Sequence, residues 1–216
     1  MNKRCLLQLS FFSGKLNISI FSVLTIFLFV LADFSVFTAI LVSCILIHEL
    51  SHLITMKICK GKVKKINVYP FGIDIVSDIH TLSYTKELII VLSGGVANLV
   101  CALTAQLVFG RGYSTEMCFF VFANTLLGVG NLVPLPVFDG GRAVHIIIER
   151  FFLPDTAYTL RKWTDGLSFL LFFAFSVLFM LFTKCNFTAV MCVAYTALAA
   201  IIYEKLVAKD CYRGKL

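Results

Sequence analysis

The sequence has very little charge for its length, and this shortage excludes an ordinary soluble domain. Charged residues make up 14% of the 216 residues and hydrophobic residues 59%, whereas soluble domains carry about 25% charged residues. Long apolar runs of the kind that cross a bilayer take up about half of the chain. The composition therefore predicts an integral membrane protein.

Two further features are missing. The eight cysteines include no C-x-x-C pair, so we expect no disulfide framework and interpret them as small packing residues. Lys15 interrupts the first apolar stretch, and no small-residue cleavage site follows it, which argues against a removable signal peptide. We therefore expect the N-terminus to be retained.

Hydropathy predicts an all-α polytopic membrane protein with about six transmembrane helices. The expected spans lie near Ile18–Ala32, Ser35–Met56, Leu88–Phe109, Met117–Val133, Leu167–Phe182 and Phe187–Tyr203. With this layout, all 19 Lys and Arg residues except Arg111 and Lys184 fall on one side of the membrane. The positive-inside rule makes that side, with both termini, cytoplasmic. The net charge of +7 then reflects topology and anionic lipid rather than nucleic-acid binding.

The second span contains the most informative motif, H-E-L-S-H at positions 48–52. Ionisable side chains inside a membrane span are costly and usually mark a functional site. In a helix His48 and His52 lie on one face, so both imidazoles can bind one metal ion with Glu49 beside them. For the motif alone two alternatives stay open, hydrogen-bonded packing histidines or part of a proton path.

A second segment, Asn131–Arg142, contains two prolines that would break a membrane helix. Irregular backbone at membrane depth is tolerated only where it is buried in protein or lines a wet cavity, so we expect this segment to line a site. Asp139 is its only carboxylate, and the expected topology places it at a depth comparable with the histidines. Taken alone, Asp-Gly-Gly would be an ordinary turn at a helix end.

Two more segments lie between these motifs. In the polar stretch Lys60–Lys86, apolar and polar residues alternate on both sides of Y-P-F-G at 69–72, which predicts a small membrane-surface β-hairpin over Ile66–Ile75. Its free edge could bind an extended peptide or could be merely structural. In the third span, the small residues of S-G-G-V-A-N at 93–98 would allow close helix packing, and Asn98 is expected to hydrogen-bond between helices.

The remaining histidines and carboxylates compete poorly as metal ligands. His80 lies in the expected cytoplasmic loop and His145 among apolar residues, and both are interpreted as surface or packing residues. Asp155 and Asp165 are expected in loops.

Together, these motifs resemble the site-2 protease family of intramembrane zinc metalloproteases. That family pairs H-E-x-x-H on one core helix with an Asn-to-Asp-Gly segment on another, which corresponds here to Asn131 and Asp139-Gly140. Y-P-F-G looks like the family's surface hairpin, and S-G-G-V-A-N looks like its small-residue motif, although proline often stands where Gly95 does. The short first span, the six-span layout and the missing PDZ insertion most resemble the stage IV sporulation protein FB branch.

The resemblance implies one catalytic zinc ion per chain, held by His48, His52 and Asp139 with a fourth position open. Glu49 would be the catalytic proton acceptor, and Asn131 would bind substrate or help hold the oxyanion, unless it is only a packing amide. The resemblance further implies a single domain over 1–216, with a catalytic core at about 18–150 and accessory helices at about 166–206. We expect no PDZ or CBS domain, which puts ATP control through a CBS domain in doubt.

The expected function is cleavage of a membrane-associated protein near the cytoplasmic face of the bacterial cell membrane. By resemblance, the substrate is a mother-cell sigma-factor precursor, the location is the mother-cell-derived forespore membrane, and inhibitory membrane proteins are further candidate partners. One alternative is a housekeeping site-2 protease acting on anti-sigma factors or remnant signal peptides. Another is a metal or proton-coupled carrier, although this would leave Glu49 without its role and no inverted repeat of broken helices is visible.

Overall fold

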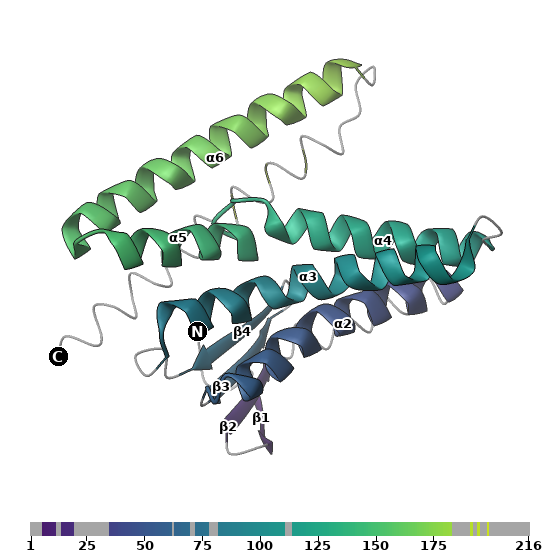
Figure 1. Cartoon of the computed structure of the whole chain (residues 1–216), viewed down its shortest axis with the longest axis horizontal. Helices are drawn as coiled ribbons and strands as arrows, with labels where there is room; N and C mark the ends of the chain where they lie inside the picture. The colour runs from purple at the N-terminus through teal and green to yellow at the C-terminus, as the bar shows by residue number, and fades with distance from the viewer. Residues whose placement is uncertain are drawn as a thin grey trace. The chain divides into compact units, whose positions relative to one another are not determined.

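The computed structural model describes residues 6–11, 14–19, 35–61, 63–69, 72–77, 82–110 and 114–182, with 191, 194 and 198. They belong to two compact units, Met1–Gly130 and Asn131–Leu216, which are described in turn. Figure 1 shows the helices and strands. Within the described ranges, four helices are long and apolar enough to cross a membrane: α2 (Val36–Ile58), α3 (Tyr84–Phe109), α4 (Thr115–Leu132) and α6 (Pro154–Phe182). The architecture is that of a polytopic helical membrane protein.

Helix α2 has clear boundary signals at both ends. Ser35 caps its start, where the side-chain oxygen accepts a hydrogen bond from the Thr38 amide at 3.3 Å. After its last turn Lys60 has a φ of 59°, and the Gly61 amide donates to the Met56 carbonyl at 2.9 Å. This left-handed turn stops the helix and directs the chain into the sheet.

Helices α2, α3 and the part of α4 in the first unit pack on one another. A Cβ on Gly128 of α4 would lie under 3.0 Å from the Gly95 carbonyl of α3, so glycine is required for this close approach. Phe37 of α2 and Phe119 of α4 make an edge-to-face contact with ring centroids 5.2 Å apart. The expected second, third and fourth spans correspond to these three helices.

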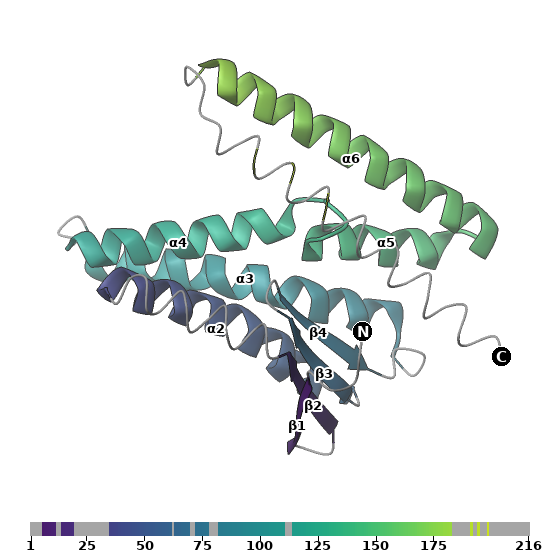
Figure 2. The same ribbon diagram turned by 180° about the vertical axis from the view of Figure 1, so that it is seen from behind.

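Four strands form one sheet in the order β1-β2-β3-β4. They are β1 (Leu6–Phe11), β2 (Gly14–Ser19), β3 (Val63–Tyr69) and β4 (Gly72–Ser77). The central pair β2 and β3 is parallel, and the two outer pairs are antiparallel. In Figures 1 and 2 the sheet lies beside the end of α2 and the start of α3, the two helices that β3 and β4 connect.

This sheet differs from the expectation of an all-α protein with a single hairpin. Residues 66–75 lie in β3, β4 and their connection, with Val68 opposite Ile73, but β1 and β2 are not among the expected elements. Their alternation of apolar and polar residues runs directly into a long apolar stretch, so hydropathy merges the two patterns. The predicted first span accordingly starts at Ile18, inside β2, and the rest of that span lies outside the described residues.

The second unit is built from the loop after α4 and two helices, α5 (Asp139–Phe151) and α6. The sequence predicted neither α5 nor the first half of α6, and Asp155 and Asp165 lie in α6 rather than in loops. Pro154 suits the first helical position, where an amide hydrogen has no partner within the helix. The expected span at 167–182 is the second half of α6, and the one at 187–203 lies outside the described residues except Met191, Ala194 and Leu198.

Candidate metal site

Helix α2 brings the two motif histidines together inside the first unit. Their spacing of four residues puts both rings on one face of the helix. His48 is 7% exposed and His52 8% exposed, and their Nε2 atoms lie 3.2 Å apart. The two imidazoles are therefore buried and converge through the same ring nitrogen.

The other ring nitrogen of each histidine faces an oxygen acceptor. Nδ1 of His52 lies 2.8 Å from the backbone carbonyl oxygen of Ile90 on α3. Nδ1 of His48 lies 2.9 Å from the side-chain oxygen of Asn98, also on α3. Because both partners accept, each Nδ1 donates and holds a ring proton, which leaves Nε2 as the ring nitrogen that can bind a metal.

Two lone pairs that face each other across 3.2 Å suit a cation between them. Two imidazole nitrogens on one tetrahedral zinc ion, with bonds of 2.0–2.1 Å, are separated by about 3.3 Å. The observed distance matches this separation, and the bonds from Nδ1 to carbonyl oxygens are those that orient metal-binding histidines. The histidine pair therefore fits a metal ion of the zinc type.

Gly94 of α3 leaves the space that these rings occupy. A Cβ at this position would lie under 3.0 Å from Nε2 of both His48 and His52. The backbone carbonyl of neighbouring Gly95 is the atom that a Cβ on Gly128 of α4 would meet, as described above. Within the small-residue motif, Gly94 thus leaves room for the histidine rings, and the backbone of the next residue lies where α4 approaches closely through Gly128.

Glu49, the expected proton acceptor, and Asn131, the expected substrate-binding residue, are both partly buried. Glu49 directly follows His48 in α2, and Asn131 lies in the last turn of α4. Asn98, expected to bond between helices, does so by donating to Asn124 of α4 at 2.9 Å. Asn98 also contacts His48, and helix packing alone does not require this contact.

Asp139 belongs to the second unit, where it is the first residue of α5. The preceding loop is anchored by Leu135, which is fully buried. A Cβ on Gly140 or Gly141 would lie under 3.0 Å from the backbone oxygens of Leu132 and Leu135, respectively. The two glycines therefore let the loop fold tightly over the start of the helix and present the Asp139 carboxylate there.

The ligand types of these residues agree with a catalytic metal. His48 and His52 of the first unit and Asp139 of the second each carry a side chain of a type that can bind a metal ion. Two imidazole nitrogens and one carboxylate oxygen are ligands that zinc accepts, and three protein ligands are typical of catalytic rather than structural sites.

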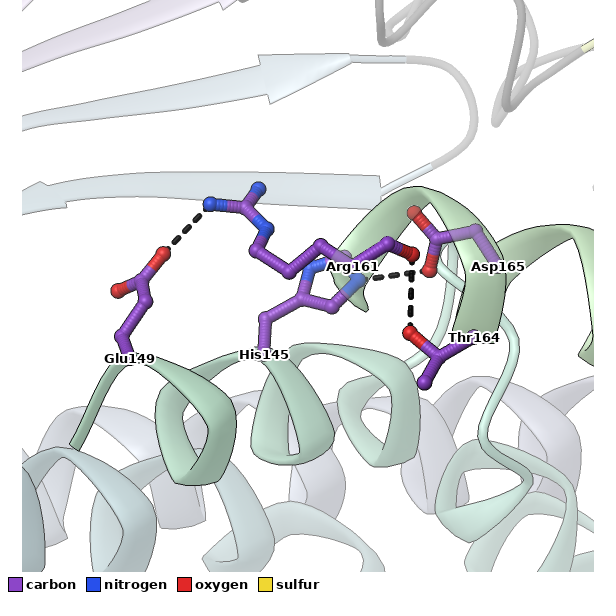
Figure 3. A network of polar contacts seen from close by, with 5 residues as sticks. All are labelled: His145, Glu149, Arg161, Thr164 and Asp165. Atoms are coloured by element: carbon purple, nitrogen blue, oxygen red, sulfur yellow. Dashed lines mark hydrogen bonds and ion pairs between the residues drawn. The ribbon is translucent and has the colours of Figure 1, made fainter. Parts of the chain in front are cut away.

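His145 has a different partner. Its Nε2 lies 2.6 Å from the Asp165 carboxylate, which joins α5 to α6, and Arg161 bonds to Glu149 across the same helix pair (Figure 3). His145 thus contributes to helix packing, as expected of a packing residue. His80 lies outside the described residues.

Two residues at the site were not identified from the sequence. The sequence marks Gly94 only as part of a packing motif and does not distinguish Asn124 from the other residues of its helix. Asn124 could have been noticed as an amide within an apolar helix, since such groups need a buried partner.

Comparisons with known proteins support the fold. Neither the family models nor the curated proteins give a match. Among solved structures, the Site-2 Protease from Methanocaldococcus jannaschii is similar, with a TM-score of 0.58 and 19% sequence identity over 88% of this chain and 91% of that chain. The chain thus adopts the fold of a site-2 protease.

Proposed function

We propose that this protein is an intramembrane zinc endopeptidase of the site-2 protease type. The observation that carries the proposal is the buried pair of Nε2 atoms of His48 and His52, 3.2 Å apart in an apolar helix, with Glu49 next in the chain. The fold shared with a solved site-2 protease supports it. In this proposal Asp139 supplies the third ligand, because it is the carboxylate of the matching Asp-Gly motif.

Zinc, when bound, would supply Lewis acidity to a water molecule and to the substrate carbonyl. Glu49 takes the proton of the attacking water and passes it to the nitrogen of the leaving amine as the peptide bond breaks. His48 and His52 keep their orientation through the Nδ1 bonds to Asn98 and Ile90. Asn131 would hold the substrate backbone or the developing oxyanion through its amide.

The proposed substrate is a membrane-associated protein presented in an extended form. β4 pairs with β3 alone among the described strands, so its other edge can accept the backbone of an added strand. Unfolded backbone of this kind is what a peptidase needs at its metal. The β4 edge is therefore the proposed place of substrate engagement.

The substrate class follows from the motif resemblance to the stage IV sporulation protein FB branch. It is a sigma-factor precursor cut near the cytoplasmic face, with both chain ends cytoplasmic by the positive-inside rule. Anti-sigma factors and remnant signal peptides are the competing class.

Co-expression of the full chain with one member of each class, followed by immunoblotting and mass spectrometry of the product ends, tests the proposal. We expect one substrate to be cut near its membrane segment, with activity lost on chelation and restored by zinc. Purified, zinc-loaded protein that cuts none of these classes would count against the peptidase function.

A further inference from the structure

A buried chain of hydrogen bonds runs from His48 through α3 to α4. Its members Asn98 and Asn124 are both 0% exposed. Nδ1 of His48 bonds to Oδ1 of Asn98, and Nδ2 of Asn98 donates to Oδ1 of Asn124 at 2.9 Å. Two buried amides in series do more than join helices, because the direction of their hydrogen bonds determines which nitrogen of His48 holds the proton.

The direction of Asn98 is set by the backbone of the metal-site helix itself. Nδ2 of Asn98 also donates to the Cys44 carbonyl at 3.0 Å. A carbonyl oxygen only accepts, so the NH2 end of the amide must face Cys44 and the oxygen end must face His48. With an acceptor fixed opposite it, Nδ1 of His48 must hold the proton.

The direction of Asn124 is set independently, and it agrees. Its Nδ2 donates to the Phe120 carbonyl of its own helix and to the sulfur of Cys44, each at 3.0 Å. The Phe120 carbonyl can only accept, so Oδ1 of Asn124 is left to face Asn98. The carbonyl groups of Cys44 and Phe120 therefore fix one donor-to-acceptor direction for the hydrogen bonds that join Asn124, Asn98 and His48.

The opposite arrangement would disable the metal site. If the proton of His48 moved to Nε2, it would point at Nε2 of His52, 3.2 Å away. The two histidines would then satisfy each other with a hydrogen bond and leave no pair of ligands. Without Asn98 and Asn124, this hydrogen bond between the two histidines could form. The hydrogen bonds of the two asparagines exclude it.

We propose that Asn98 and Asn124 are positioning residues that hold the proton of His48 on Nδ1 and so keep its Nε2 unprotonated, as a metal ligand must be. Asn98 acts directly on the histidine, and Asn124 acts through Asn98. The inference deepens the proposed function, on which it rests for the identity of the metal.

The experiment measures tautomers in metal-free, full-length protein in detergent, by NMR of ¹⁵N-histidine with His48→Gln for assignment. We expect Nδ1 to be protonated in both motif histidines of the wild type. In Asn98→Leu, which keeps the branching at the γ position but has no amide, the His48 proton should appear on Nε2, and zinc affinity against a competing chelator should fall roughly 10- to 100-fold.

Asn124→Leu should shift both measurements in the same direction by a smaller factor, because Asn98 keeps its bond to Cys44. The matched control is Thr125→Val, the neighbour on α4 whose hydroxyl bonds only to the Val121 carbonyl and is exposed; it should behave as the wild type. If Asn124→Leu matches the control while Asn98→Leu does not, the role of Asn124 is refuted.

Wild-type protein with His48 protonated on Nε2 would overturn the proposal without any variant, even if the leucine variants fail to fold. So would Asn98→Leu with an unchanged tautomer and zinc affinity. Neither readout involves cleavage. A protein with these tautomers and this zinc response that cut no substrate would therefore refute the proposed function and leave the positioning role intact.

Discussion

Gly94 of α3 lies directly against the imidazole of His52 on α2. A Cβ on this glycine would meet Nε2 of His52, and Nε2 of His48 as well, at less than 3.0 Å. A methyl group at this position would therefore occupy the space beside the two Nε2 atoms, where a metal would bind.

Gly94→Ala should lower the zinc content from one ion per chain to a small fraction of that value, because the rings must rotate away from each other to admit the methyl group. Elemental analysis of detergent-purified protein gives the measurement. Gly130→Ala is the control, since a Cβ at Gly130 meets nothing within 4 Å and alanine favours the helix by about 1 kcal/mol. A fully zinc-loaded Gly94→Ala protein would contradict the proposed geometry.

Glu49→Gln should keep zinc and folding while cleavage falls at least about 100-fold, because the ligands remain and only the proton acceptor is lost. The comparison requires zinc content and cleavage rate on the same preparation. Cleavage at the wild-type rate would eliminate the proposed mechanism, whereas a carrier would show transport that depends on the ligands.

Asp139→Ala should lose zinc as His48→Ala and His52→Ala do, because each removes one of three ligands. His145→Gln serves as the control, since glutamine can still donate to Asp165 and His145 is bonded away from the metal ligands. Full zinc retention in Asp139→Ala would remove this residue from the ligand set.

The pair His145 and Asp165 should stabilise the α5–α6 hairpin more than the pair Glu149 and Arg161. The first pair is 15% and 27% exposed, and Arg161 and Glu149 are 36% and 41% exposed. A double-mutant cycle of resistance to unfolding should give a coupling of about 1–3 kcal/mol for the first pair and about 0–1 kcal/mol for the second. Equal couplings would show that burial does not distinguish the two pairs.

Proline at Ile73 and at Asp74 should separate the two edges of β4, because successive residues direct their amides to opposite sides of a strand. The variant whose lost amide pointed to the free edge should keep zinc and cut poorly, since it loses only a donor on that edge. The other should fail to accumulate, as should Val68→Pro in β3, a strand paired on both sides. If both β4 variants cut normally, substrate binds elsewhere, and the Asn131–Asp139 segment is the next candidate.

Local patterns in the sequence predicted the membrane class and the motif-bearing helices. The spacing of His48 and His52 and the long apolar runs are properties of neighbouring residues, so α2, α3 and α4 could be located without tertiary information. Hydropathy does not predict helix α5 or the start of α6, because the polar residues of these segments lower its value. Some of those polar residues pair across the hairpin, as His145 does with Asp165 and Glu149 with Arg161.

The sequence by itself determined which residues could bind a metal, since ligand chemistry and helical spacing are local. Only the tertiary structure decided which ring nitrogens face each other and where their protons lie. Those features depend on the Ile90 carbonyl, Asn98 and Gly94 of α3, and on Asn124 of α4. Contacts between residues 38 to 50 positions apart leave no periodic signal along the chain, because they arise when helices pack and the direction of each buried hydrogen bond is set by its neighbours.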